Sequence, residues 1–164
     1  MALHDDSIFQ NKNGKIEILN FQGETKQIVP LSDSDGEITL MEIVGKHMVV
    51  VTANNTIRIW DVSWWNLKQV GMSWRFEKNG DSLGDIKHIS INCSGKKIAI
   101  IAEQSYPSIK IPDTKFYVYD VDLDMFYDQE VEYNRVPTES SWDLEDERLL
   151  AVETEYMAGI SKVL

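Results

Sequence analysis

The residues whose spacing could bind a metal ion are three alternating carboxylates: Asp120, Asp122 and Asp124. Such an alternation opens the calcium-binding loop of an EF-hand, which also needs glycine at its sixth position and glutamate at its twelfth. Counted from Asp120, those positions hold Met125 and Val131, so the motif fails. The acidic stretch 32–37 fails likewise, because Ile43 and Val44 stand where the closing glutamate should be. Both stretches are therefore predicted to be turns.

The other side chains that could bind metal or act as nucleophiles are dispersed along the chain. His4, His47, His88 and Cys93 show no metal-ligand spacing among themselves. His47 lies in an apolar run, and Cys93 at a strand end, so both are predicted to be packed side chains. The sequence also lacks a Gly-x-Ser-x-Gly elbow, a phosphate-binding loop and a dinucleotide fingerprint. It therefore predicts no cofactor, no metal site and no enzymatic activity.

An aromatic residue followed by aspartate recurs at three places: Trp60-Asp61, Tyr119-Asp120 and Trp142-Asp143. At the end of a strand, the aromatic ring packs between neighbouring sheets and the carboxylate holds the next turn through hydrogen bonds. These six residues are predicted to be structural features of a repeat, because stacked repeats need such anchors.

A second aromatic group contains Trp64 and Trp65, followed by Trp74 and Phe76. Two adjacent tryptophans on a strand point to opposite faces. They could pack between sheets, or lie exposed as a protein-binding hot spot. Both interpretations stay open at this stage.

The net charge of the chain limits the classes of partner that it could bind. The formal net charge of −11 offers no basic surface for the phosphates of nucleic acid or of anionic lipid. Between residues 113 and 155 the only cations are Lys115, Arg135 and Arg148. This acidic stretch is either a solvated face or a surface for a basic segment of a protein partner. The candidate partner-binding residues within it are Glu145, Asp146 and Glu147.

The elements that would position these residues are strands. Residues 38–44, 47–51 and 56–61 are apolar or alternate with period two, and Gly45-Lys46 and Asn54-Asn55 separate them as turns. Residues 67–76 would add a fourth strand. Four antiparallel strands joined by short turns form one blade of a β-propeller.

The same pattern returns at residues 86–91, 97–102 and 115–120, with residues 126–133 as an outer strand. Gly45 and Gly95 occupy matching turns 50 residues apart, which is a typical propeller repeat length. The blades are predicted at residues 15–37, 38–80, 85–134 and 136–156, with residues 157–164 as a tail.

The predicted fold class is therefore all-β: one partial WD-repeat β-propeller domain over residues 1–164, with about three blades in an open arc. A closed propeller has at least four blades, so a truncated form of a larger protein is expected. With no signal peptide and no apolar run of membrane-spanning length, a cytoplasmic location is the default.

Three stretches carry a family resemblance: residues 57–63, 112–124 and 142–153. Over roughly residues 15–155 the chain resembles the second WD propeller of the intraflagellar transport protein 140 family, whose members are subunits of complex A. The sequence departs from the family at Trp64-Trp65, where charged residues are expected.

The resemblance implies a non-catalytic protein-interaction scaffold in the cytoplasm, the cilium and the ciliary base. It implies a role in retrograde transport, cilium assembly and ciliary entry of membrane receptors. The implied partners are other complex A subunits and cargo adaptors, without nucleic acid or direct membrane insertion. The alternative is a WD-repeat adaptor of another assembly, such as a vesicle coat or a ubiquitin ligase.

Overall fold

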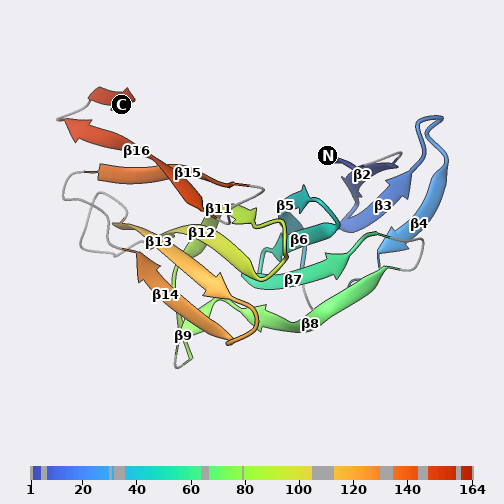
Figure 1. Cartoon of the computed structure of the whole chain (residues 1–164), viewed down its shortest axis with the longest axis horizontal. Coiled ribbons are helices and arrows are strands. Elements are labelled where there is room, and N and C mark those ends of the chain that lie inside the picture. The colour runs from blue at the N-terminus through green and yellow to red at the C-terminus, as the bar shows by residue number, and fades with distance from the viewer. Residues whose placement is uncertain are drawn as a thin grey trace. The chain divides into compact units, whose positions relative to one another are not determined.

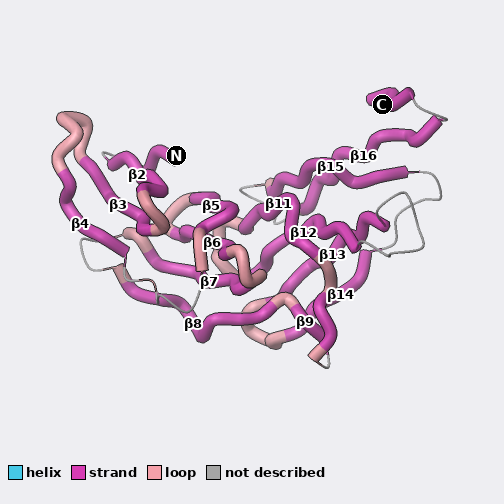
Figure 2. Tube along the Cα trace, turned by 180° about the vertical axis from the view of Figure 1, so that it is seen from behind, coloured by secondary structure: helices cyan, strands magenta, loops and turns pink. Residues whose placement is uncertain are grey.

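The computed structural model describes residues 2–4, 7–29, 31, 36–63, 67–78, 80–104, 113–129, 135–143, 148–157 and 160–163. These residues form strands, turns and loops, and none of them is helical (Figure 2). By its internal contacts the chain divides into two compact units, Met1–Phe76 and Glu77–Leu164. The strand-rich composition predicted this all-β class, since β-branched and aromatic residues suit a pleated surface.

The first unit contains two four-stranded antiparallel sheets, each with its strands in chain order (Figure 1). The first sheet consists of β1 (Ala2–His4), β2 (Ser7–Lys12), β3 (Lys15–Leu19) and β4 (Thr25–Val29). The second consists of β5 (Ile38–Val44), β6 (His47–Thr52), β7 (Thr56–Asp61) and β8 (Lys68–Arg75).

The second unit contains a short hairpin and two larger antiparallel sheets. The hairpin pairs β9 (Glu77–Lys78) with β10 (Asp81–Ser82). The four-stranded sheet consists of β11 (Asp85–Ile91), β12 (Lys97–Gln104), β13 (Asp113–Asp120) and β14 (Met125–Gln129). The last sheet consists of β15 (Arg135–Trp142), β16 (Leu149–Met157) and β17 (Ile160–Val163).

The longest buried runs of the described residues lie on the second strands of the two sheets β5–β8 and β11–β14. Every residue of β6 is buried, and in β12 the run from Ile98 to Ala102 is buried. In the first unit, one cluster of buried side chains draws on both sheets and includes Phe9, Ile18, Met48 and Trp60. Central strands covered on both faces read as continuous apolar runs, which explains why these were the clearest strands in the sequence.

The first strands of three sheets share an irregularity that the sequence did not reveal. The pairing register of β5, of β11 and of β15 with the next strand shifts by one residue, at Thr39, Lys87 and Thr138 respectively. A shift of this kind is a β-bulge, which bends the strand and increases its twist. Its recurrence at the same strand of successive sheets strengthens the evidence for a structural repeat.

Some predicted boundaries were wrong. The first sheet begins at Ala2, because β1 and β2 pair N-terminal to residue 15 where the first blade was expected to start. Strand β17 lies within residues 157–164, the expected tail, because it pairs with β16. Both differences involve short or weakly alternating segments that become strands by pairing with a stronger neighbour.

Candidate protein-interaction surface

Trp60 and Asp61 end the third strand of the second sheet. The Trp60 side chain is 1% exposed and belongs to the core cluster of the first unit. The Asp61 carboxylate accepts a 2.9 Å hydrogen bond from the Ser63 amide and a second, short one from the Ser63 hydroxyl. The Val62 amide donates to the Lys46 carbonyl at 2.7 Å. The tryptophan therefore anchors the strand in the core, and the aspartate holds the turn that leaves it.

The environment of Asp61 favours its charged form. Hydrogen bonds from the side chain and backbone of Ser63 lower the pKa of this carboxyl, and the Lys46 ammonium at 3.7 Å acts in the same direction. A lowered folded-state pKa means that the carboxylate stabilises the fold above its unfolded-state pKa of about 3.9. That contribution is lost as the pH falls through the folded-state pKa.

We expect Asp61→Asn to weaken the pH dependence of stability in acid. Between about pH 5 and pH 3, the free energy of unfolding should fall less steeply in this variant than in the wild type. Urea titrations at several pH values measure the slope. Ser63→Ala keeps the carboxylate and removes one hydrogen-bond donor, so it should give an intermediate slope. Parallel slopes in all three proteins would contradict the prediction.

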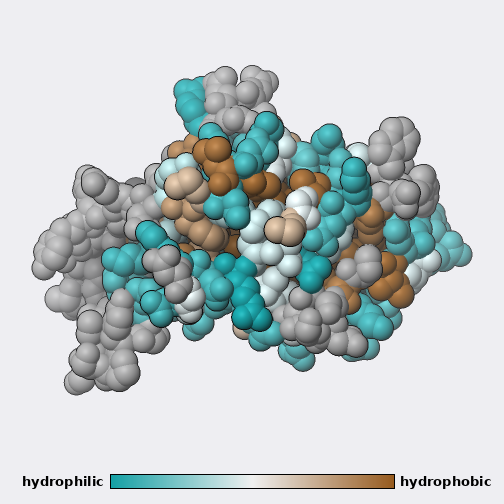
Figure 3. Space-filling view, turned by 90° about the horizontal axis from the view of Figure 1, so that it is seen from below, coloured by the Kyte–Doolittle hydropathy of each residue, from teal (hydrophilic) through white to brown (hydrophobic). Residues whose placement is uncertain are grey.

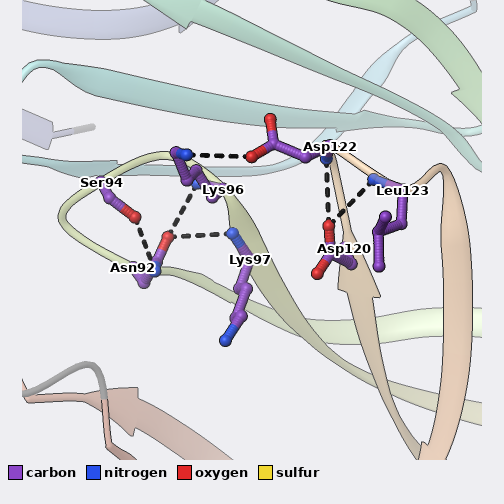
Figure 4. A network of polar contacts seen from close by, with 7 residues as sticks. All are labelled: Asn92, Ser94, Lys96, Lys97, Asp120, Asp122 and Leu123. Atoms are coloured by element: carbon purple, nitrogen blue, oxygen red, sulfur yellow. Dashed lines mark hydrogen bonds and ion pairs between the residues drawn. The ribbon is translucent and has the colours of Figure 1, made fainter.

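Tyr119 and Asp120 occupy the matching place in the second unit, at the end of β13. Tyr119 is fully buried, its ring centroid lies 4.5 Å from that of Phe126, and its hydroxyl donates to Asp124 Oδ1 at 2.6 Å. Burial and this carboxylate raise the pKa of Tyr119, so the phenol stays protonated and keeps donating. Asp120 Oδ1 accepts from the Asp122 and Leu123 amides at 3.1 and 3.0 Å (Figure 4).

A second turn closes beside this one. Asn92 is fully buried, and its Oδ1 accepts from the Lys96 and Lys97 amides at 2.9 Å each (Figure 4). Its Nδ2 donates to Ser94 Oγ at 2.9 Å. Lys96 Nζ lies 2.9 Å from Asp122 Oδ2, which ties the two turns together. Figure 4 shows both turns facing each other across this ion pair.

Trp142 lies elsewhere in its sheet: it ends the first strand, β15, whereas Trp60 and Tyr119 lie on third strands. Its indole Nε1 donates to the Ser90 carbonyl at 2.9 Å, and its ring packs with Leu149 against Ala99, Ile101 and Phe116. Asp143, the next residue, forms an ion pair with Arg148, whose Nη2 atom lies 3.7 Å from Asp143 Oδ2. Trp142 thus joins β15 to the sheet of β11–β14 by both packing and a hydrogen bond.

Polar side chains extend this junction. The hydroxyls of Ser90 and Ser140 lie 2.7 Å apart, and the Ser140 amide donates to His88 Nε2 at 3.0 Å. The same Nε2 atom lies 3.1 Å from the Ser140 carbonyl oxygen, so the His88 ring contacts the β15 backbone at Ser140. Buried His47 lies in β6, and half-buried Cys93 lies in the turn after β11. The described residues contain no cluster of His, Cys, Asp or Glu that could hold a metal ion.

Five candidate partner-binding residues lie outside the described residues: Trp64, Trp65, Glu145, Asp146 and Glu147. Of the other two aromatic residues grouped with Trp64 and Trp65, Trp74 is half-buried on β8 and Phe76 is buried. For Trp64 and Trp65, both interpretations, a protein-binding hot spot and packing between sheets, therefore remain predictions.

The structure reveals exposed apolar residues that sequence reasoning did not single out. Figure 3 shows that hydrophobic side chains reach one face in small patches among hydrophilic ones. Three exposed residues follow one another at alternate positions: Leu123, Met125 and Tyr127. Their alternation was visible in the sequence, but it does not reveal which face of a strand is covered. Within the described part of the chain, no helix is long and apolar enough to cross a membrane.

Comparison with known proteins identifies a family and a fold. A family model described as the IFT140 second beta-propeller matches residues 1–132, a match that ends before Trp142. The crystal structure of the Myceliophteria thermophila Cps50 (Swd1) β-propeller domain superimposes with a TM-score of 0.63 at 12% identity. It is matched over 92% of this chain and 46% of its own.

The crystal structure of the tricorn protease superimposes with a TM-score of 0.59 at 13% identity, over 96% of this chain. This chain spans 46% and 15% of the lengths of these two structures. At such identities the likeness concerns the fold alone. The chain is thus a partial β-propeller, as its sequence predicted.

Proposed function

The chain belongs to the IFT140 second beta-propeller family, and from that membership we propose that it acts as a protein-interaction scaffold in intraflagellar transport. Its role is non-catalytic: rigid sheets hold turns and strand edges that other proteins bind. The proposed partners are other subunits of complex A and cargo adaptors. The proposed setting is retrograde transport and receptor entry at the cilium and the ciliary base.

The observation that carries this proposal is the family match over residues 1–132. The geometry supports a scaffold because three polar side chains of the described residues hold the turns of the sheets. Asp61, Asp120 and Asn92 each accept hydrogen bonds from nearby backbone amides.

The proposal is tested in ciliated cells that lack the parent protein. A parent carrying Glu145→Lys, Asp146→Lys and Glu147→Lys should be recruited more slowly by complex A partners than the wild type. With purified partners, the association rate should fall about tenfold at low salt. The loss should shrink at moderate salt, because ions screen charges at exposed sites.

A matched control reverses the same number of charges elsewhere. Glu77, Asp81 and Asp85 are exposed acids near the start of the second unit, and their change to lysine should leave the rate within about twofold. Equal rates for both triple variants and the wild type would remove the acidic surface from the proposal. The scaffold function itself would be rejected if both variants were recruited to the cilium normally and no complex A subunit copurified with the parent protein.

A further inference from the structure

Strand β14 forms the outer edge of its sheet. It pairs with β13 through five consecutive residue pairs, from Met125↔Asp120 to Gln129↔Phe116, with no shift of register. On its other side, β14 pairs with no strand of the described residues. A regular edge strand presents backbone N–H and C=O groups in the spacing that a further strand requires.

The other edge strands of the four-stranded sheets carry features that discourage strand addition. The register of β4 shifts by one residue at Lys26, and β8 departs from register between Val70 and Trp74. Strands β5 and β11 have the bulges described above, and β1 has only three residues. Bulges, edge lysines and short length are the usual protections against unwanted pairing. Strand β14 has none of the three.

The side chains along β14 add an apolar contact to this edge. Leu123, Met125 and Tyr127 are 60%, 51% and 40% exposed. Met125 and Tyr127 lie on one face of the strand, because alternate residues share a face. Phe126 faces the other way and stacks on buried Tyr119. The apolar side chains of Met125 and Tyr127 are two residues apart, which is also the spacing of same-face side chains on an incoming strand. They could therefore contact apolar side chains of that strand.

Charge defines what kind of strand fits. Residues 125–129 contain no lysine or arginine, and the preceding turn carries Asp120, Asp122 and Asp124. Asp122 and its ion-pair partner Lys96 are both 61% exposed, so this pair lies in solvent and contributes little stability. An approaching basic side chain can compete for the carboxylate, whereas an acidic segment would be repelled.

We propose that β14 is a strand-addition site for an extended segment of another protein in which apolar and basic residues alternate. Backbone hydrogen bonds to the β14 edge supply affinity, the exposed apolar side chains set the register, and the acidic turn selects a basic partner. The inference deepens the proposed scaffold function by naming one binding edge and the chemistry of its partner.

The test uses the full chain attached to a surface at low density, so that copies cannot pair. The probe is a capped seven-residue peptide of alternating lysine and valine. It should bind, and it should slow amide hydrogen exchange in β14. Two peptides serve as controls: one with glutamate in place of lysine, and one with proline at the central position, which cannot complete the ladder. Both should bind at least tenfold more weakly.

Variants locate the site. Met125→Lys places a like charge on the contact face and should weaken binding of the lysine–valine peptide at least tenfold. Met125→Leu should bind as the wild type does. Ile28→Lys makes the same kind of change at an exposed position of β4, an edge strand with a bulge, and should also leave binding unchanged.

Three outcomes would overturn the inference: equal binding of the lysine and glutamate peptides, unchanged binding by Met125→Lys, or exchange protection outside β14. Sedimentation of the chain in solution tests a fourth outcome, which is self-association. Self-association that Met125→Lys abolishes would assign the edge to a second copy. The scaffold proposal fails separately, since it depends on copurification of complex A subunits with the parent protein and not on this peptide.

Discussion

Trp60→Ala is expected to destabilise the first unit by about 3–5 kcal/mol, because truncating a large buried aromatic leaves a cavity that the surroundings fill only in part. Trp60 is 1% exposed and packs in the cluster that draws on both sheets of this unit. It lies at the end of a central strand, between β6 and β8, where its partners are Met48 and Gln69. The loss should therefore affect both sheets together.

Urea unfolding followed by circular dichroism measures this loss. Trp60→Phe keeps an aromatic ring and should cost roughly half as much. Trp74→Ala is a matched control, because Trp74 is half-buried on the outer strand β8 and packs beside Gly71. It should cost about 1–2 kcal/mol. A loss below about 1 kcal/mol for Trp60→Ala would show that this tryptophan does not anchor the two sheets.

Asn92→Ala is expected to cost about 2–3 kcal/mol, because it leaves two backbone amides without their acceptor in the turn between β11 and β12. The Asn92 carboxamide is fully buried and bonds to the Lys96 and Lys97 amides and to Ser94. Removing it should also release the Lys96–Asp122 ion pair, which depends on the position of that turn.

The chain offers a matched control with the same local chemistry at the surface. Asn20 Oδ1 accepts from the Gln22 and Glu24 amides at 3.0 and 2.8 Å, in an exposed turn. Water can replace this acceptor, so Asn20→Ala should cost only about 0.5–1 kcal/mol. Equal losses for the two variants in urea unfolding would mean that burial of Asn92 adds nothing to its hydrogen bonds.

The sequence predicted the strands of the sheets β5–β8 and β11–β14 closely, because these strands depend on patterns of neighbouring residues. Residues 47–51 and 97–102 are apolar runs bounded by Gly45 and Gly95, and such runs become strands wherever both faces are covered. The turn chemistry was equally local, since Asp61 and Asp120 hold amides two or three residues away. The family resemblance rested on residues 57–63, 112–124 and 142–153. The family match over residues 1–132 confirms the family and includes the first two of these stretches.

The rest depended on pairing between distant segments. Trp142 follows the same aromatic–aspartate pattern as Trp60, yet it ends a first strand and bonds to Ser90, 52 residues away. No local rule separates the two cases, because a dipeptide does not encode which strand of a sheet it will join. Strands β1 and β17, and the hairpin of β9 and β10, were missed for the same reason: short segments become strands only when a neighbour pairs with them.

The sequence by itself thus determined the fold class, the repeat and the turns, because alternation and short-range hydrogen bonds are properties of neighbouring residues. Only the tertiary structure decided which edges are protected and which side chains are covered. Lys26 and Thr39 become bulge residues through register with another strand, and Met125 is exposed because β14 ends its sheet among the described residues. Register and coverage are relations between segments, so they exist only once those segments are packed together.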